Sequence, residues 1–359
     1  MSPSPLGSDF AGLLAAVRPA IEARLQTLWE RKLAARGRHG AEVTAMIDAG
    51  RDLTLRGGKR FRAALLAAAY IGTDPDGLLE PAFAGGVCLE LLQSYLLIQD
   101  DWIDGDVTRR GGPSAHVLLT KALGGNSHLG VSTAILSSDF TWGLALDVLA
   151  HAELPAARVL AAIQLLAKVH EDVVVGQQID IIGRAEDVEE MHALKTGSYT
   201  VSGPLALGAT LAGASPEVLA ALEVYAAPVG VAFQLRDDLL GTFGSEEETG
   251  KPVGNDLKNG KRTVIIAEAL REGGRLDDAG KQALARAFGR ADASPEDVAV
   301  ATYALEAAGA RKAVTERLVA LCNQAEALAA GLPLAEPART MLAGAAAALR
   351  WTGKMGDRA

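Results

Sequence analysis

Residues 93–113 read QSYLLIQDDWIDGDVTRRGGP, an apolar run that leads into four acids and then two arginines. Residues i and i+4 share a helix face, so Asp100 and Asp104 point the same way and repel each other. A divalent ion removes this repulsion, and Mg2+ takes oxygen ligands and often bridges carboxylates to phosphates. Arginine side chains then suit the remaining phosphate oxygens. The stretch predicts a helix end that holds a diphosphate through Mg2+. The alternative is a solvated acidic helix end.

A second acidic stretch favours the diphosphate site. Residues 233–238, FQLRDD, again end an apolar run with two acids, Asp237 and Asp238. A glycine-containing basic segment follows, with TGKP at 249–252 and NDLKNGKRT at 255–263. Lysines supply point charges for phosphate oxygens, and glycines let the backbone fold over a ligand. Two acidic helix ends that face each other would hold metal ions from both sides.

Composition and periodicity indicate an all-α protein. The chain has 359 residues, of which 49% are hydrophobic and only 4% aromatic, so Ala and Leu dominate the core. Apolar residues recur at helical spacing along most of the chain, and no useful run alternates with a period of two. Ser-Pro-Glu at 215–217 and 294–296 is typical of a helix start. Nothing reads as a linker, so we expect a single domain over residues 1–359, a bundle of ten or more helices.

The charge and the apolar runs exclude several classes. A net charge of −9 argues against general nucleic-acid binding. The longest uncharged run, residues 197–216, carries glycines and prolines and reads as a buried helix with its turn, so no transmembrane segment is expected. No secretion signal is visible at the start, which favours a cytoplasmic protein. Cys88 and Cys322 lack metal-ligand spacing and read as buried thiols.

Five motifs in order resemble those of the polyprenyl synthetase family, the trans-isoprenyl diphosphate synthases. They are the two acidic stretches, GGKRFR at 57–62, KTG at 195–197, and the basic segment that ends at Thr263. The resemblance implies the isoprenoid synthase fold, in which helices surround a deep central cavity. It also implies head-to-tail prenyl transfer, in which an allylic diphosphate ionises and isopentenyl diphosphate attacks the carbocation. Three Mg2+ ions in the substrate complex and a homodimer are further expectations of the resemblance.

The motif matches assign a role to each candidate residue. The metal ligands would be Asp100, Asp101, Asp104, Asp237 and Asp238. The allylic diphosphate would contact Arg109, Lys195, Thr196, Gln234, Lys251 and Lys261, of which Lys195, Thr196 and Gln234 are the candidate catalytic residues. Isopentenyl diphosphate would contact Lys59, Arg62, Gln93 and Arg110. For Gln234, a satisfied core amide is the alternative.

Two features refine the resemblance. The second acidic motif has Gly241 where many family members carry a last aspartate, which puts a ligand from that position in doubt.

In the family, bulky residues before the first acidic motif form the floor of the chain pocket. Tyr95, five residues before Asp100, lies roughly 7.5 Å below it on a helix, with Leu96 and Leu92 beside it. No insertion splits the motif, which resembles archaeal-type geranylgeranyl diphosphate synthases, so a C20 product is expected first and C15 second.

Two other functions compete with the synthase. A class I terpene cyclase also uses an Asp-Asp-x-x-Asp motif on an all-α fold, but it needs no second anion site, which GGKRFR and Arg110 would supply. A non-catalytic regulatory subunit of a prenyl synthase is the second alternative. Such subunits usually lose acidic motifs, whereas this chain keeps both. The sequence therefore favours a Mg2+-dependent prenyltransferase.

Overall fold

The protein is described here by a computed structural model that covers residues 6–182, 188–244, 254–271 and 275–351. Its elements are helices, apart from one pair of two-residue strands in the described residues, so the all-α prediction is confirmed. The chain divides into two compact units, and each is described by itself. Unit 1 comprises Met1–Val169, Gly203–Glu223 and Gly331–Gly344, and unit 2 comprises the remainder. The expectation of a single domain stays a prediction.

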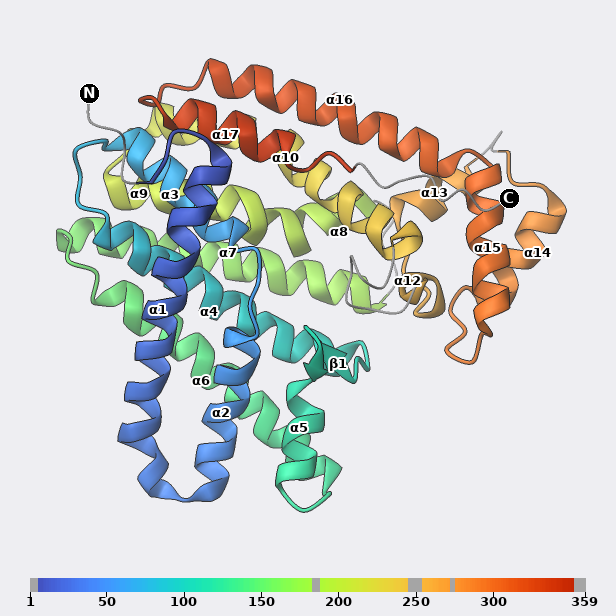
Figure 1. Ribbon diagram of the computed structural model, residues 1–359, viewed down its shortest axis with the longest axis horizontal. Helices are drawn as coiled ribbons and strands as arrows, with labels where there is room; N and C mark the ends of the chain where they lie inside the picture. Colours follow the sequence, from blue (N-terminus) through green and yellow to red (C-terminus); the bar gives the residue numbers. More distant parts are fainter. Residues whose placement is uncertain (1–5, 183–187, 245–253, 272–274, 352–359) are drawn as a thin grey trace. The chain divides into compact units, whose positions relative to one another are not determined.

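Unit 1 contains most of the amino-terminal helices and the small hairpin. Its elements are α1 (Phe10–Arg36), η1 (Gly37–His39), α2 (Ala41–Leu55), α3 (Phe61–Thr73), α4 (Glu80–Ile103), β1 (Thr108–Arg109), β2 (Gly112–Pro113), α5 (Ala115–Ala122), α6 (Ser127–Ala150) and α9 (Gly203–Ala212). Helix α1 begins at Asp9, whose side chain accepts the Gly12 amide, and it buries a regular apolar stripe. The short turn η1 folds α2 back along α1, as Figure 1 shows.

The core of unit 1 lies around α4. This helix packs against α3, α6 and α9, and most of its side chains are buried. A smaller cluster joins α2, α4, α5 and α6 through Leu53, Ile98, Leu119 and Ala134, each buried to 2% exposure or less. This cluster lies beside the carboxyl end of α4, where the first acidic motif begins. The helix end is therefore fixed by packing from neighbouring elements.

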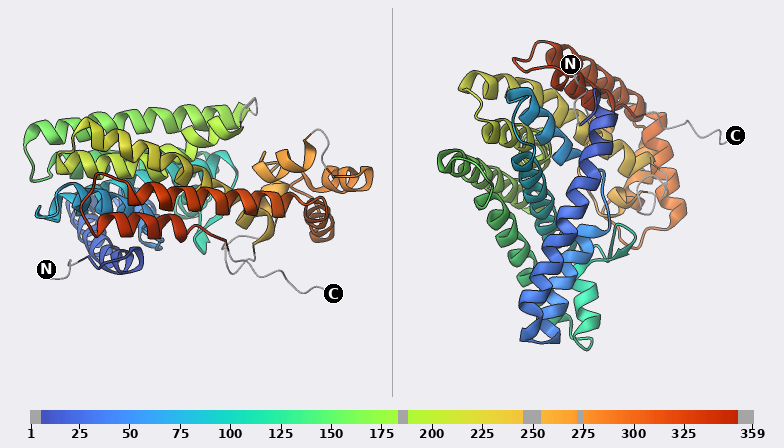
Figure 2. Two further views of the ribbon diagram at one scale, coloured as in Figure 1. Left: turned by 90° about the horizontal axis from the view of Figure 1, so that it is seen from above. Right: turned by 60° about the vertical axis from the view of Figure 1, so that its left-hand side comes forward.

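Unit 2 contains mostly carboxyl-terminal helices. Its elements are α8 (Val188–His192), the π-helical segment η2 (Ala193–Ser202), α12 (Asn255–Lys258), α13 (Val264–Leu270), α14 (Asp278–Ala287), α15 (Pro295–Ala307) and α16 (Ala310–Ala330). The unit boundaries fall within α7 (Ala156–Ile182), α10 (Pro216–Phe243) and α17 (Ala338–Ala347). Helices α14 and α15 pack together (Figure 2). The Ser-Pro-Glu start at 294–296 is confirmed, since the Ser294 hydroxyl caps α15 by accepting the Asp297 amide.

Among the described residues, two helices are long and apolar enough to cross a membrane by length and composition alone, α4 and α10. For α4, 72% of the apolar window is buried within the fold. A buried helix of this kind passes the same test as a membrane span, because both are apolar on all sides. The apolar character of α4 is therefore explained by its central place in unit 1.

Candidate active site

The first acidic motif lies at the carboxyl end of α4. The helix ends at Ile103, and the amide of Asp104 donates to the Asp100 carbonyl as the chain leaves the helix. Asp104 is exposed and the Asp100 side chain is one-quarter exposed, whereas the Asp101 side chain is fully buried. Neighbouring helical residues point in different directions, so this difference follows from the helix itself. Asp100 and Asp104 present oxygens outward, and Asp101 faces the protein.

Arg109 neutralises the buried side of this motif. Its Nε lies 2.5 Å from Asp101 Oδ1, and its Nη2 lies 3.1 Å from Asp106 and 3.4 Å from Asp100. Burial nevertheless raises the pKa of Asp101 to about 6, an effect that Arg109 opposes. The Asp101 Oδ2 atom is buried and has no hydrogen-bond partner. The carboxylate oxygens of the motif therefore outnumber the hydrogen bonds that Arg109 donates to them.

The glycine-lysine-arginine motif separates three basic side chains. Gly57 and Gly58 take positive φ angles of 93° and 147°, which allow the sharp turn before α3. Lys59 is then exposed, while Arg62 is buried to 8% exposure at the start of α3. Gln93 on α4 is half-buried. Unit 1 thus contains all four residues expected to bind isopentenyl diphosphate; their role stays a prediction.

Arg60, between Lys59 and Arg62, has a structural role that sequence reasoning missed. Its Nη1 donates to Glu90 at 2.6 Å and its Nη2 donates to the Thr54 carbonyl at 3.1 Å. The Arg60 and Glu90 side chains are only 1% and 2% exposed. A signal was present, because Glu90 is a lone acid inside an apolar helix, and a buried charge needs a partner. The motif itself does not show which of its cations turns inward.

The second acidic motif in unit 2 repeats the pattern of the first. Asp237 is exposed, and Asp238 is fully buried. Asp238 accepts the Gln234 side-chain amide at 2.7 Å and the Val264 backbone amide at 3.0 Å. Burial raises the pKa of Asp238 to about 6, although Lys261 and these hydrogen bonds lower it. Gln234 is therefore engaged with the motif, as its alternative interpretation expected, and its contact with substrate stays a prediction.

The expected lysines of unit 2 are paired with acids. Lys195 Nζ lies 2.5 Å from Asp180, and Thr196 follows it on η2. Lys261 Nζ lies 3.7 Å from Asp256. Lys251 lies outside the described residues. Asp180 and Asp256 were not singled out from the sequence, and both place carboxylate beside a cation that a diphosphate would otherwise engage.

Asp256 also explains the departure at Gly241. A Cβ atom built at Gly241 would overlap the Asp256 carboxylate. Residue 241 therefore has no room for a side chain, and the acid from α12 occupies that space. The unit keeps a carboxylate beside the position where the motif lacks one. No local sequence pattern predicts this exchange, because the two residues lie 15 positions apart.

Gly241→Ala is expected to displace the Asp256 carboxylate and to weaken its pairing with Lys261. The added methyl group meets only the end of the Asp256 side chain, so the loss of stability is expected at about 1 kcal/mol, the low end of overpacking costs. Thermal unfolding followed by circular dichroism checks the effect. Gly143→Ala is the matched control, because a Cβ there meets nothing within 4 Å on its helix. An unchanged melting temperature for Gly241→Ala would contradict this account of the position.

The accessible carboxylates suit a hard divalent ion. Across the described ranges, no group of three or more His, Cys, Asp or Glu side chains is arranged as a metal cage. Mg2+ is commonly held by one or two carboxylates together with substrate phosphates, so it needs no such cage. Asp100 and Asp104 offer outward oxygens in unit 1, and Asp237 is the exposed acid in unit 2. The donor set therefore fits Mg2+.

Tyr95 lies in the core of unit 1, one and a half turns before Asp100. It is 6% exposed, and its ring centroid is 5.7 Å from that of Trp142 on α6. Gln99 hydrogen-bonds to Tyr95, and its own amide donates to the Ser138 hydroxyl at 3.2 Å. Leu92 is fully buried and Leu96 is half-buried. The tyrosine is thus held by an aromatic contact and a polar one.

Comparisons with known proteins agree with the motifs. The family model described as "Polyprenyl synthetase" matches residues 44–305. A geranylgeranyl diphosphate synthase of Methanosarcina mazei is 33% identical over 273 residues, 74% of this chain and 76% of that protein. A (2E,6E)-farnesyl diphosphate synthase of Mycobacterium bovis is 32% identical over 272 residues, 74% of this chain and 71% of that protein. The crystal structure of geranylgeranyl pyrophosphate synthase from Corynebacterium glutamicum, complexed with isoprenyl diphosphate and magnesium, superposes with a TM-score of 0.85. It is 33% identical and covers 92% of this chain and 97% of its own.

Proposed function

This chain belongs to the polyprenyl synthetase family, and we propose that it condenses isopentenyl diphosphate head-to-tail with an allylic diphosphate. The products would be a short all-trans polyprenyl diphosphate and free diphosphate. One observation carries the proposal: each acidic helix end keeps an accessible first aspartate, Asp100 and Asp237, beside a buried second one. Relatives with such printed activities support it.

Asp100, Asp104 and Asp237 would hold Mg2+, and we propose three ions in the substrate complex. When bound, Mg2+ would neutralise the negative charge of the departing diphosphate. Asp101 and Asp238 are turned inward, so their part is to fix the geometry of each acidic end and to hold Arg109 and Gln234. Carboxylates that are already hydrogen-bonded lose little freedom when a ligand arrives, which favours binding.

The cationic side chains would divide between the two diphosphates. Arg109, Lys195, Lys251 and Lys261 would bind the allylic diphosphate, with Thr196 and Gln234 beside the reacting carbon. Lys59, Arg62, Gln93 and Arg110 would bind isopentenyl diphosphate. Fixed cations stabilise the charge that develops on the leaving group without reorganising at the moment of reaction. The apolar core around α4 would keep water from the carbocation.

Omission of isopentenyl diphosphate separates this function from its alternatives. A synthase releases diphosphate from an allylic substrate at a useful rate only when isopentenyl diphosphate is present. A class I terpene cyclase turns over the allylic diphosphate alone, and a non-catalytic regulatory subunit turns over neither. Diphosphate release from purified protein, with and without isopentenyl diphosphate, is the measurement. Turnover that does not depend on isopentenyl diphosphate would contradict the proposal.

We propose C20 as the main product and C15 as the second. Two proteins similar to this chain carry geranylgeranyl synthase names, and another is a farnesyl diphosphate synthase. Tyr95 would close the proposed chain pocket below Asp100, together with Leu92 and Leu96. The tyrosine is braced by Trp142 and Gln99, so a growing chain cannot push it aside at low cost.

Tyr95→Ala is expected to lengthen the product. The truncation removes the ring that fills the space next to Trp142, so the chain can extend by at least one further C5 unit. Chromatographic sizing of dephosphorylated products measures the change. Tyr303→Ala is the control, because that tyrosine is 72% exposed on α15. An unchanged product length for Tyr95→Ala would show that Tyr95 does not form the floor of the chain pocket.

We also propose that the protein forms a homodimer through helix α6. Helix α6 carries Leu129, Ile135 and Leu136, each about half exposed, and Leu129 and Leu136 are two helical turns apart. These exposed apolar side chains support the proposal of an interaction surface on α6. Sedimentation velocity is expected to find a dimer, and Leu136→Glu a monomer, whereas Val300→Glu on α15 should leave the dimer intact. A monomeric wild-type protein would contradict the proposal.

The cytoplasmic location stays a prediction.

A further inference from the structure

The two arginines that follow the first acidic motif lie on a very small hairpin. Strands β1 and β2 pair Thr108 with Pro113 and Arg109 with Gly112, and Arg110 takes a positive φ of 52° at the turn. A hairpin of two residues a side is too short to hold its own shape in water. Its position must therefore come from contacts with the rest of unit 1.

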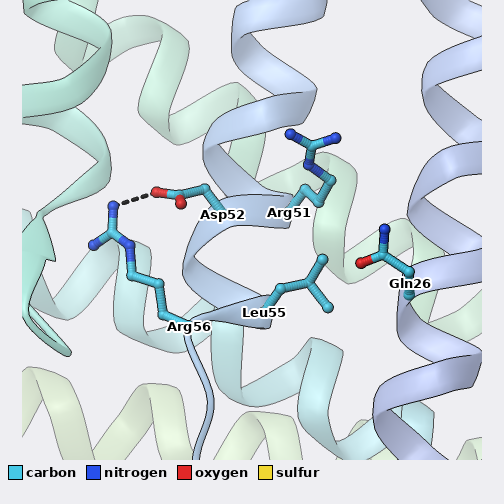
Figure 3. A pocket seen from close by; sticks show the side chains of 5 residues that line it. All are labelled: Gln26, Arg51, Asp52, Leu55 and Arg56. Carbon is cyan, nitrogen blue, oxygen red and sulfur yellow. Dashed lines mark hydrogen bonds and ion pairs between the residues drawn. The ribbon is translucent and has the colours of Figure 1, made fainter.

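Arg56 contacts both strands of the hairpin. It follows α2, and its Nη1 donates to the Arg109 carbonyl at 3.0 Å and to the Pro113 carbonyl at 2.8 Å. Nη2 of the same guanidinium pairs with Asp52, one turn earlier on α2. Figure 3 shows this pair beside Arg51 and Leu55 of α2 and Gln26 of α1, which line the same pocket. One side chain thus binds both strands of the hairpin, and Asp52 fixes its direction.

A side chain of the hairpin also binds α2. Arg110 Nη1 donates to the Leu53 carbonyl at 3.2 Å. Leu53 is 2% exposed and belongs to the core cluster of α2, α4, α5 and α6. The carbonyl that accepts this bond is therefore fixed by packing. Arg56 and Arg110 together tie the end of α2 and the hairpin in both directions.

Gly112 is shaped for this contact. A Cβ atom at Gly112 would lie 2.5 Å from Arg56 Cζ and 2.6 Å from its Nη1. The Arg56 guanidinium occupies the space that a side chain at residue 112 would need. A side chain at 112 would therefore require the guanidinium to shift from its place beside the two carbonyls. The glycine and the arginine therefore form a matched pair, although 56 positions separate them.

We propose that Arg56 is a positioning residue that sets the place of Arg109 and Arg110 for the two diphosphates. The inference rests on the proposed function, since it concerns the residues that would bind allylic and isopentenyl diphosphate. Arg56 itself touches neither. Its loss releases the backbone of both arginines at once, so both substrates bind more weakly while the chemistry of a bound pair changes less.

Steady-state kinetics on Arg56→Ala, Gly112→Ala and the double variant test the proposal. Hydrogen bonds from a charged donor are commonly worth about a tenfold or larger change in affinity. Arg56→Ala is expected to raise the KM for both substrates about tenfold, with kcat changed much less. Gly112→Ala should do the same. The double variant should be no worse than Arg56→Ala, because the overlap disappears with the guanidinium.

Hydrogen exchange separates positioning from loss of the fold. In Arg56→Ala, amides of residues 108–113 should exchange faster, while α3 and α4 keep wild-type protection. Arg51→Ala is the matched control, since Arg51 lines the same pocket but pairs with Asp48; its kinetics should equal those of wild type. If Arg56→Ala unfolds, Gly112→Ala and Arg56→Lys carry the test, and Lys should restore only part of the affinity.

Two results would overturn the inference. One is wild-type KM values for both substrates in Gly112→Ala or Arg56→Ala. The other is a double variant whose losses multiply, which would mean that the two residues act separately. An inactive wild-type protein would instead contradict the proposed function. Hydrogen exchange of residues 108–113 would still show whether Arg56 holds the hairpin, so failure of the proposed function and failure of the positioning role are distinguishable.

Discussion

Asp100→Asn is expected to lower kcat by two to three powers of ten, while the KM for isopentenyl diphosphate changes little. Asp100 is the accessible first acid of its motif, and its side chain is one-quarter exposed at the end of α4. The amide keeps the shape but loses the charge that would hold Mg2+ against the leaving diphosphate. Losing one group that stabilises developing charge commonly costs about 10²–10³ in kcat.

The matched variants for this test come from the same chain. Asp237→Asn should produce a similar loss, because Asp237 is the accessible first acid of the other motif. Asp76→Asn should leave kcat unchanged, since Asp76 is an exposed residue in the turn before α4. Melting temperatures of all three should stay near wild type. If Asp100→Asn keeps wild-type kcat, the carboxylate plays no part in the reaction.

Arg60→Met is expected to reduce the free energy of unfolding by about 3–5 kcal/mol. The variant leaves the Glu90 carboxylate buried without its partner at 2.6 Å, and it also removes the donor to the Thr54 carbonyl. Methionine adopts the backbone angle of 52° at residue 60 no better and no worse than arginine, so the change isolates the charge. Urea unfolding followed by circular dichroism measures the loss.

Two further variants test whether the loss of unfolding free energy comes from the unpaired Glu90 carboxylate. Arg60→Met with Glu90→Leu should recover most of the stability, because a buried ion pair replaced by apolar groups is often neutral. Lys59→Met, one residue away, should leave stability unchanged and raise the KM for isopentenyl diphosphate, because Lys59 is exposed. If Arg60→Met is as stable as wild type, the buried pair does not hold the motif in place.

The helical architecture could be read from the sequence because it depends on local patterns. Apolar residues at helical spacing, among them Val17, Ile21 and Leu25, predicted α1, and the Ser-Pro-Glu start predicted α15. The candidate site residues were predicted because their motifs resemble those of the polyprenyl synthetase family. The small hairpin at 108–113 escaped, since two-residue strands have no periodicity to detect.

The rest depends on contacts between distant residues. The buried position of Arg60 in GGKRFR depends on Glu90, 30 positions away. The space at Gly241 is taken by Asp256, and that at Gly112 by Arg56. A sequence shows a glycine at each place but not the side chain that needs the room. Motif matching finds the groups that would touch substrate, and packing reveals the groups that hold them.

Product analysis with labelled isopentenyl diphosphate is the decisive test of Mg2+-dependent prenyl transfer by this chain. Purified protein is incubated with Mg2+ and each of the C5, C10 and C15 allylic diphosphates, and a parallel series contains a chelator. Labelled prenyl diphosphate is expected in the Mg2+ series, with C20 as the main product and C15 as the second, and none with the chelator. Absence of any labelled prenyl product from all three starters in Mg2+, from folded protein, would contradict it.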